Sequence, residues 1–115
     1  MLYRVMDKRE LPALVRAFME SYEVVAPVKR GQGYVFDVIE SPDDIEIGYT
    51  QTASSPKKYL MPPTETLMKF DARMNLVQDY VHEVTPRVIF GVHTCDINAM
   101  NRLDTALIGG KYVDP

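Results

Sequence analysis

The stretch VIFGVHTCDINAMNRLD, residues 88–104, combines two hydrophobic periods around a polar turn. It opens with a short run of β-branched and aromatic residues, which is typical of a buried strand. After Gly91 the spacing becomes helical. Four apolar residues then share one helical face: Ile97, Met100, Leu103 and Leu107. The pattern predicts a strand, a tight turn and a helix over residues 96–107.

Four polar residues occupy the predicted turn: His93, Thr94, Cys95 and Asp96. Ligands and partners tend to dock just past the carboxyl ends of strands in sheet-and-helix domains. A helix start also offers free N–H groups and positive partial charge, which Thr94 or Asp96 is suited to cap. Cysteines at helix N-termini tend toward a lowered pKa and act as nucleophiles or metal ligands, although most free cysteines are small buried residues. We therefore expect Cys95 and Asp96 to form the candidate site at the helix start.

The composition is that of one acidic domain. The chain has 115 residues, a net charge of −3 and a pI of about 5.3, and 46% of its residues are hydrophobic. No basic run points to nucleic acid, and no apolar run of about 18 residues points to a membrane span. The single cysteine excludes an internal disulfide, and the N-terminus lacks a signal-peptide core. We therefore expect a reducing, cytoplasmic setting.

Other hydrophobic patterns predict the remaining elements. Residues 2–6, 22–26 and 34–39 have strand composition, and a turn at 31–33 joins the last two as a hairpin. Residues 10–20 predict an amphipathic helix with the stripe Leu11, Leu14, Val15 and Phe18. Residues 41–44 predict a turn, and the alternation of Ile45, Ile47 and Tyr49 predicts a half-buried strand.

The middle of the chain is less clearly patterned. Residues 57–63 are expected to be extended, because residues before proline avoid the helical region. Residues 64–70 fit either a helix or a strand, and residues 74–84 fit both, with a strand preferred. Together the patterns predict a single α+β domain over residues 1–115. Its mixed or antiparallel sheet carries two main helices, 10–20 and 96–107, packed on it.

Few residues have the spacing of a catalytic centre. A small thiol enzyme would use Cys95 with His93 or His82 as its base. One cysteine and two histidines fall short of the roughly four ligands that a 4Fe–4S cluster or structural zinc takes, so we expect no metal in this chain alone. Lys57 and Lys58 are either a solvated pair or a contact for an acidic partner or a phosphate, and a solvated pair is preferred. We therefore expect a chain that docks or positions something and is not catalytic alone.

Several motifs, in order along the chain, resemble one family of redox subunits. The segment GVHTCD at 91–96, followed by NAM at 98–100 and LD at 103–104, resembles the G-V-R-P-C-D…A-x-x-x-L-D segment of 4Fe–4S dicluster electron-transfer proteins. That family includes the beta subunit of cytoplasmic sulfhydrogenases and the related iron–sulfur subunit of the anaerobic-type sulfite reductase. The segments YEVVAP at 22–27 and SPKKYLMPPTE at 55–65 are similar to its Y-x-V-x-x-P and P-P-K-x-x-x-x-P-x-x-E motifs. The tail KYVDP at 111–115 resembles the lead-in to D-P-Y-Y-x-x-R-R.

Two departures from the family accompany this resemblance. His93 and Thr94 stand where the family often has Arg-Pro, and the family's paired cysteine motifs do not occur in these 115 residues. The resemblance implies either the N-terminal part of a longer iron–sulfur subunit or a stand-alone relative without clusters.

The resemblance also implies a role. It implies a non-catalytic domain of an electron-transfer subunit in a hydrogenase- or sulfite-reductase-type oxidoreductase complex, whose partners are a flavoprotein and a catalytic subunit. Partner contacts are expected at Lys57, Lys58, His93 and Thr94. Cys95 or Asp96 would lend a ligand or a nearby contact to a 4Fe–4S cluster in the full assembly. A purely structural protein-interaction module is the rival interpretation.

Overall fold

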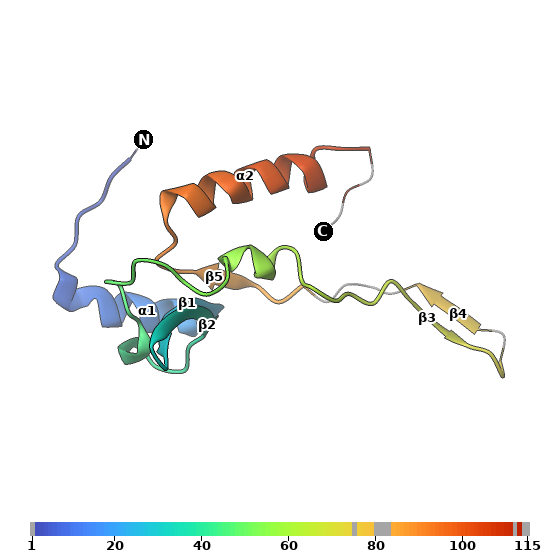
Figure 1. The fold of residues 1–115 in the computed structure, drawn as a ribbon, viewed down its shortest axis with the longest axis horizontal. Coiled ribbons are helices and arrows are strands. Elements are labelled where there is room, and N and C mark those ends of the chain that lie inside the picture. Colours follow the sequence, from blue (N-terminus) through green and yellow to red (C-terminus); the bar gives the residue numbers. More distant parts are fainter. Residues whose placement is uncertain (1, 75, 80–83, 112, 114–115) are drawn as a thin grey trace.

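The computed structural model describes residues 2–74, 76–79, 84–111 and 113, and for residues 76–79 it describes the backbone. Figure 1 shows a small sheet with one helix beside it, a second helix standing apart, and a two-stranded ribbon projecting from the body. In chain order the elements are η1 (Lys8–Glu10), α1 (Leu11–Met19), β1 (Glu23–Arg30), β2 (Gly33–Val38), η2 (Pro42–Asp44), η3 (Pro56–Tyr59), β3 (Met68–Asp71), β4 (Leu76–Asp79), β5 (Arg87–Ile89) and α2 (Thr94–Ile108), the η elements being short 3-10 helices.

The main sheet has three strands in the order β2-β1-β5. Strands β1 and β2 form the predicted antiparallel hairpin, with Val25 opposite Val38 at one end and Arg30 opposite Gly33 at the other. Gly31 has a φ of +59° in the two-residue turn, a conformation that glycine adopts without steric cost. Strand β5 pairs with β1 in parallel. The sheet is therefore mixed, and the predicted α+β class is confirmed.

Pro27 lies within the central strand β1, where its missing N–H must not be needed by a neighbour. Ile39 N donates to Val24 O at 3.0 Å, and hydrogen-bonded pairs alternate along an antiparallel ladder, so the backbone of Pro27 faces away from β2. Its carbonyl instead accepts from Glu46 N at 2.8 Å. Proline is tolerated here because β5 pairs with β1 only as far as Val25.

The two faces of the sheet carry separate cores. On one face, α1 packs through Val15 onto alternate residues of β1 and onto Ile39. On the other face, Val25 and Phe36 are covered by Tyr49 from the long loop that follows β2. Eight described hydrophobic residues are buried: Val15, Val24, Val25, Ala26, Val28, Phe36, Ile39 and Tyr49. The alternation along β1 therefore decides which side chains meet α1 and which meet the loop.

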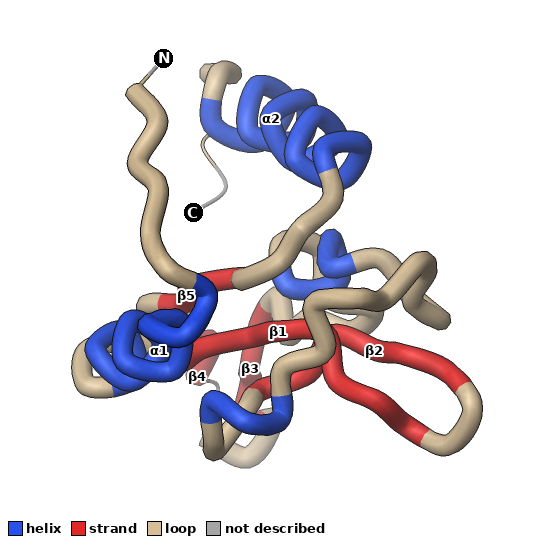
Figure 2. Tube along the Cα trace, turned by 90° about the vertical axis from the view of Figure 1, so that its left-hand side faces the viewer, coloured by secondary structure: helices blue, strands red, loops and turns tan. Residues whose placement is uncertain are grey.

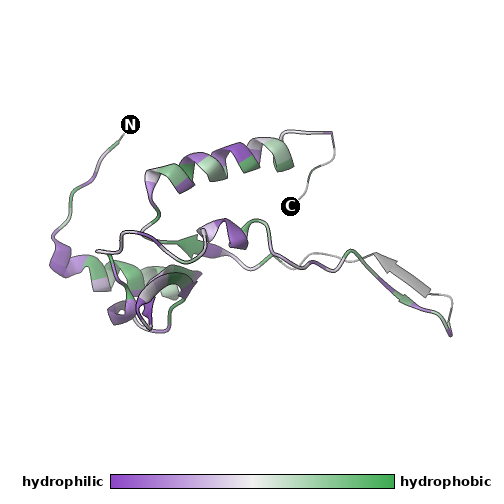
Figure 3. Ribbon diagram, viewed as in Figure 1, coloured by the Kyte–Doolittle hydropathy of each residue, from purple (hydrophilic) through white to green (hydrophobic). Residues whose placement is uncertain are grey.

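The predicted helices both form, but their stripes are buried unequally. Helix α1 covers most of the predicted range, with Val15 fully buried and Leu14 36% exposed. Helix α2 begins two residues before its predicted start and contains no buried residue. Ile97 is 46% exposed, and the rest of its stripe is half-buried. Apolar and polar stretches alternate along α2 in Figure 3. The 49–60 loop covers the face of the sheet that carries Val25 and Phe36. Helix α2 therefore contacts η3 of this loop, which covers the apolar stripe of α2 only in part.

Two predicted strands are wrong. Residues 2–6 form no strand, because no described strand pairs with them, and Leu2 and Val5 are 97% and 98% exposed. Residues 45–50 form a loop instead of a strand. Their alternation correctly indicated an inward Tyr49, but Ile47 lies in a turn with Gly48 and is exposed. Apolar alternation predicts which side chains turn inward and does not supply the neighbouring strand that a ladder needs.

The middle of the chain forms a ribbon. Residues 57–59 belong to η3 instead of being extended, because Ser55 caps that turn by accepting from Lys57 N at 3.3 Å. Of the two alternatives for residues 64–70, the strand is observed over residues 68–70, where β3 pairs antiparallel with β4, and residues 64–67 form neither a helix nor a strand. Strand β4 also confirms the preferred strand over part of 74–84, whereas residues 80–83, including His82, lie outside the described residues. Every residue of β3 is exposed.

Candidate functional site at the Gly91–Asp96 corner

The corner between β5 and α2 is built around Gly91. The strand direction continues to Phe90, whose N–H donates to Val25 O at 2.7 Å. Gly91 then adopts a φ of +76°, and a Cβ on it would lie 3.3 Å from Pro27 Cδ. Glycine is therefore favoured for its left-handed backbone and for its close approach to β1.

The start of α2 differs from the predicted cap. His93 is the N-cap, with φ −71° and ψ 154°, and its side chain makes no capping hydrogen bond. Neither Thr94 nor Asp96 is the cap, because both already lie within the helix. Asp96 sits in the first turn, where a carboxylate is stabilised by the positive end of the helix. Cys95 lies in the same turn and is exposed. The structure thus confirms the predicted helix-start position of both residues.

Tyr49 holds the corner from the loop side, a contact that the sequence pattern does not predict. Its hydroxyl donates to Gly91 O at 2.8 Å. Its ring stacks on His93, with centroids 4.4 Å apart and planes 4° from parallel, and meets Phe36 edge-on at 5.7 Å. Burial raises the pKa of Tyr49, and the nearby negative charge of Asp96 raises it further. The inward alternation of residues 45–49 was the available signal, but it did not reveal the partner.

Ser55 ties the second predicted motif to the corner. The Ser55 hydroxyl donates to Asp96 Oδ1 at 2.9 Å. Ser55 Oγ also accepts a hydrogen bond from Lys57 N. The loop and the helix start together line a pocket of about 300 Å³, formed by Tyr49, Thr50, Gln51, Thr52, Ser55, His93, Cys95 and Asp96. The segments 49–55 and 93–96 therefore form one site, and three of the four predicted turn residues line its pocket.

Lys57 and Lys58 are half-buried in η3, outside this pocket. Lys58 Nζ lies 5.2 Å from the centroid of the Tyr59 ring, within the range of a cation–π contact. The two lysines therefore lie beside the corner site, because Ser55 caps η3 and also bonds to Asp96.

The side chains of the site do not form a reacting pair. Within the described part of the chain, no hydrogen bond joins Cys95 to a histidine, and the His93 ring is occupied by its stack on Tyr49. Over the same residues, no three side chains of the His, Cys, Asp and Glu types are grouped as a metal ion requires. The arrangement presents an exposed thiol beside a carboxylate that is held in place by Ser55.

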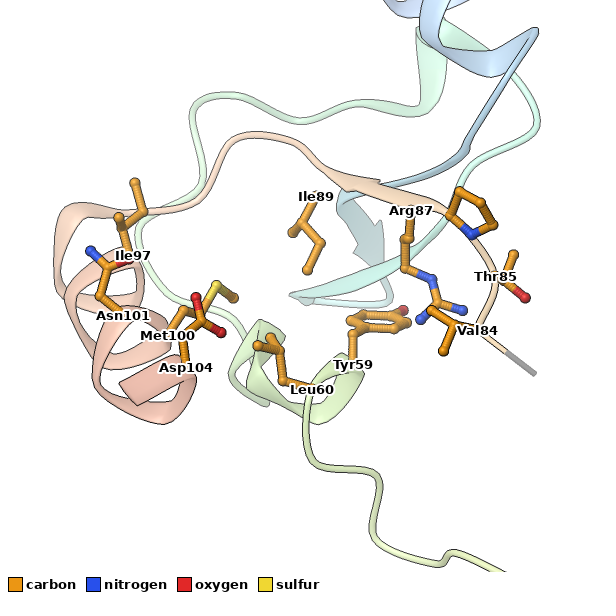
Figure 4. Close-up of a pocket in the computed structure, with 11 residues that line it drawn as sticks. Tyr59, Leu60, Val84, Thr85, Arg87, Ile89, Ile97, Met100, Asn101 and Asp104 are labelled. Atoms are coloured by element: carbon orange, nitrogen blue, oxygen red, sulfur yellow. The ribbon is translucent and has the colours of Figure 1, made fainter. Parts of the chain in front are cut away.

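A second concavity, the α2–β5 groove, lies between α2, η3 and β5 (Figure 4). Its volume is about 520 Å³, and its walls are Tyr59, Leu60, Val84, Thr85, Pro86, Arg87, Ile89, Ile97, Met100, Asn101 and Asp104. Arg87 Nε donates to Glu23 Oε1 at 2.6 Å, and its guanidinium carbon lies 5.0 Å from the Tyr59 ring centroid. Tyr59 in turn donates to Phe36 O at 3.2 Å, and burial raises its pKa. The groove is mainly apolar, with an anchored cation on one side and Asp104 on the other.

Comparison with known proteins finds a similarity to part of a longer protein. It is similar to Sulfhydrogenase 2 subunit beta of Pyrococcus furiosus, with 30% identity over 107 residues. The similarity covers 90% of this chain and 30% of that protein, so the chain spans less than a third of the relative's length. No family model and no solved structure matches the chain. The chain is therefore similar to one part of this longer beta subunit.

Among the helices of the described residues, none has the length and hydropathy needed to cross a bilayer.

Proposed function

We propose that this domain is part of an electron-transfer subunit of a hydrogenase- or sulfite-reductase-type complex, where it docks neighbouring subunits and has no catalytic role of its own. The observation that carries the proposal is the similarity to a sulfhydrogenase beta subunit over 90% of the chain. Two of the motifs that suggested this family, at 55–65 and 91–104, meet at the corner site, because the Ser55 hydroxyl bonds to Asp96.

We further propose that the domain corresponds to the N-terminal part of a longer iron–sulfur subunit in a cytoplasmic complex. The relative is about three times as long as the aligned segment, which supports this assignment. The extended shape of the chain also supports the proposal that it is part of a longer subunit. The radius of gyration is 17.7 Å, whereas a compact domain of this length has about 13 Å. Helix α2 and the β3–β4 ribbon are thus placed to pack against other polypeptide.

The described residues do not make a complete iron–sulfur site. A 4Fe–4S cluster is typically held by about four thiolates, and this chain has one cysteine. In the proposed assembly, Cys95 or Asp96 lends one ligand or a nearby contact to a cluster whose other ligands come from outside these residues. The exposure of Cys95 and the fixed carboxylate of Asp96 support this role.

The proposed partners are a flavoprotein and a catalytic subunit, contacted through Lys57, Lys58, His93 and Thr94. These residues lie on η3 and at the start of α2, which Ser55 joins. A charge-reversed variant, Lys57→Glu with Lys58→Glu, should weaken assembly of the purified complex. The matched control is Lys8→Glu with Arg9→Glu on η1, which should leave assembly unchanged.

The cluster role is tested in the natural subunit, expressed anaerobically with Cys95→Ser or Asp96→Ala. We expect an altered reduction potential or electron paramagnetic resonance spectrum, or a lower iron content. Asn98→Ala, at an exposed position of α2, is the control. If iron content, potentials and spectra are the same in all variants, Cys95 and Asp96 have only a structural role.

A further inference from the structure

Residues 2–6 have apolar side chains that their own chain does not bury. Leu2, Tyr3 and Val5 are 97%, 81% and 98% exposed. The segment has strand composition but is unpaired, as no described strand lies beside it. Asp7 begins η1 by accepting from Arg9 N at 2.9 Å, which fixes the point where the segment leaves the body. Figure 1 shows it running outward from the α1 end of the molecule.

The α2–β5 groove offers a strand edge and an apolar surface, which residues 2–6 lack in their own chain. Strand β5 is at the edge of the sheet. Pro86 O accepts from Glu23 N, and Phe90 N donates to Val25 O, so every second residue of this segment bonds to β1. The N–H and C=O groups of the residues between them, Arg87 and Ile89, therefore point away from β1. An edge of this kind is a template for an added strand. Figure 4 shows Ile89, Leu60, Met100 and Ile97 around the space next to this edge.

The charges of the segment and the groove are complementary. Arg4 is the only charged residue of the segment, and no described residue forms an ion pair with it. Arg87 is already paired with Glu23, whereas Asp104 lines the groove from an exposed position on α2. A strand that directs Leu2, Arg4 and Met6 into the groove places an arginine between two apolar residues, opposite Asp104.

We propose that residues 2–6 of one copy add to the β5 edge of a second copy and fill its α2–β5 groove, so that two chains exchange arms about a two-fold axis. The occupant is a second copy because the arm projects from its own body with exposed side chains while every copy presents the same groove. Reciprocal exchange buries both arms and closes the assembly as a dimer. This inference does not rest on the proposed redox function, and in it the polypeptide that covers the groove side of α2 is the arm of the second copy.

The test measures self-association of the full chain by sedimentation equilibrium over a range of concentrations. Deleting residues 2–6 should weaken the dimer by at least about a hundredfold, because burying even two apolar side chains has an effect of that order. Met100→Asp should weaken it as well, whereas Asn98→Asp, on α2 but outside the groove, should not. Circular dichroism should show the same folded spectrum for all variants.

Charge reversal tests the pairing itself. Arg4→Asp or Asp104→Arg alone should raise the dimer dissociation constant about 2- to 20-fold, and the double variant should return toward the original value. A chain that is monomeric at all concentrations overturns the proposal. So does a dimer that survives the deletion, or a monomer whose residues 3–6 are protected from hydrogen exchange, since the segment would then cover its own groove.

Discussion

At the scale of single residues, Gly91 and Tyr49 together determine the shape of the corner. Gly91 supplies a left-handed backbone against Pro27, and Tyr49 binds the Gly91 carbonyl while stacking on His93. The two residues are 42 positions apart in the sequence. The exposed position of Cys95 depends on both, because they fix the chain just before α2 starts.

Replacing Gly91 by alanine should destabilise the fold by about 1–3 kcal/mol, since a non-glycine residue at positive φ is strained and its Cβ would crowd Pro27. Urea unfolding measures the difference. Gly48→Ala is the control, because nothing lies within 4 Å of its added Cβ and its φ is not left-handed. That variant should change the free energy of unfolding by less than about 0.5 kcal/mol. Equal effects at both positions would contradict the role given to Gly91.

Replacing Tyr49 by phenylalanine should cost about 1 kcal/mol at neutral pH, because the Gly91 carbonyl loses its donor. The pKa of Tyr49 is raised above the unfolded value of 10.0, chiefly by burial. Its contribution to stability is therefore complete below pH 10.0 and is lost as the pH rises through the folded-state pKa. The free energy of unfolding should therefore fall less in alkali for the variant than for the original chain. Part of the fall that remains comes from Tyr59, whose pKa is also raised by burial.

Chemical unfolding at neutral and alkaline pH tests this prediction, with Tyr22→Phe as a control on a 45% exposed tyrosine. If Tyr49→Phe and the original chain lose stability in parallel above pH 10.0, the raised pKa of Tyr49 does not contribute.

At the scale of elements, the two helices differ in how much of their stripe the sheet covers. Helix α1 buries Val15 against β1, whereas α2 rests on η3 with its stripe only half-buried. Figure 2 shows α1 close to β1 and α2 set apart from the sheet, beyond the connecting loops. The helical pattern alone predicts the same burial for both.

Val15→Ala should therefore cost more than Leu14→Ala, although it removes fewer atoms. Val15 is fully buried, and its truncation should cost about 2 kcal/mol from lost transfer energy and the resulting cavity. Leu14 is 36% exposed, and its truncation should cost less than the 2–5 kcal/mol expected of a fully buried leucine. Thermal or urea unfolding ranks the two. A larger loss for Leu14→Ala would show that the inner face of α1 is assigned wrongly.

At the scale of the whole molecule, the described chain is elongated, with dimensions of 58 × 32 × 29 Å. An isolated two-stranded ribbon is marginally stable in water, and every residue of β3 is exposed, so the ribbon needs a covering partner. The apolar stripe of α2 is also covered only in part by the described residues. In the proposed function, these exposed faces of α2 and the ribbon are the surfaces that dock other polypeptide.

The 115-residue chain should remain colourless and take up no cluster after anaerobic reconstitution with iron and sulfide, because one thiolate is far short of about four. Iron analysis and the visible absorption spectrum measure this, with a known cluster protein treated in parallel. About four irons per chain and a brown colour would contradict it.

The sequence by itself determined the α+β class, the β1–β2 hairpin, both helices and the helix-start position of Cys95 and Asp96. These features follow from local rules: hydrophobic period, turn glycines and the limits that proline sets. Only the tertiary structure decided that residues 2–6 and 45–50 are not strands, that Tyr49 and Ser55 clamp the corner, and that α2 stands off the sheet. Each of these depends on which distant segment lies alongside, and a ladder, a stack or a hydrogen bond needs a partner that local spacing does not specify.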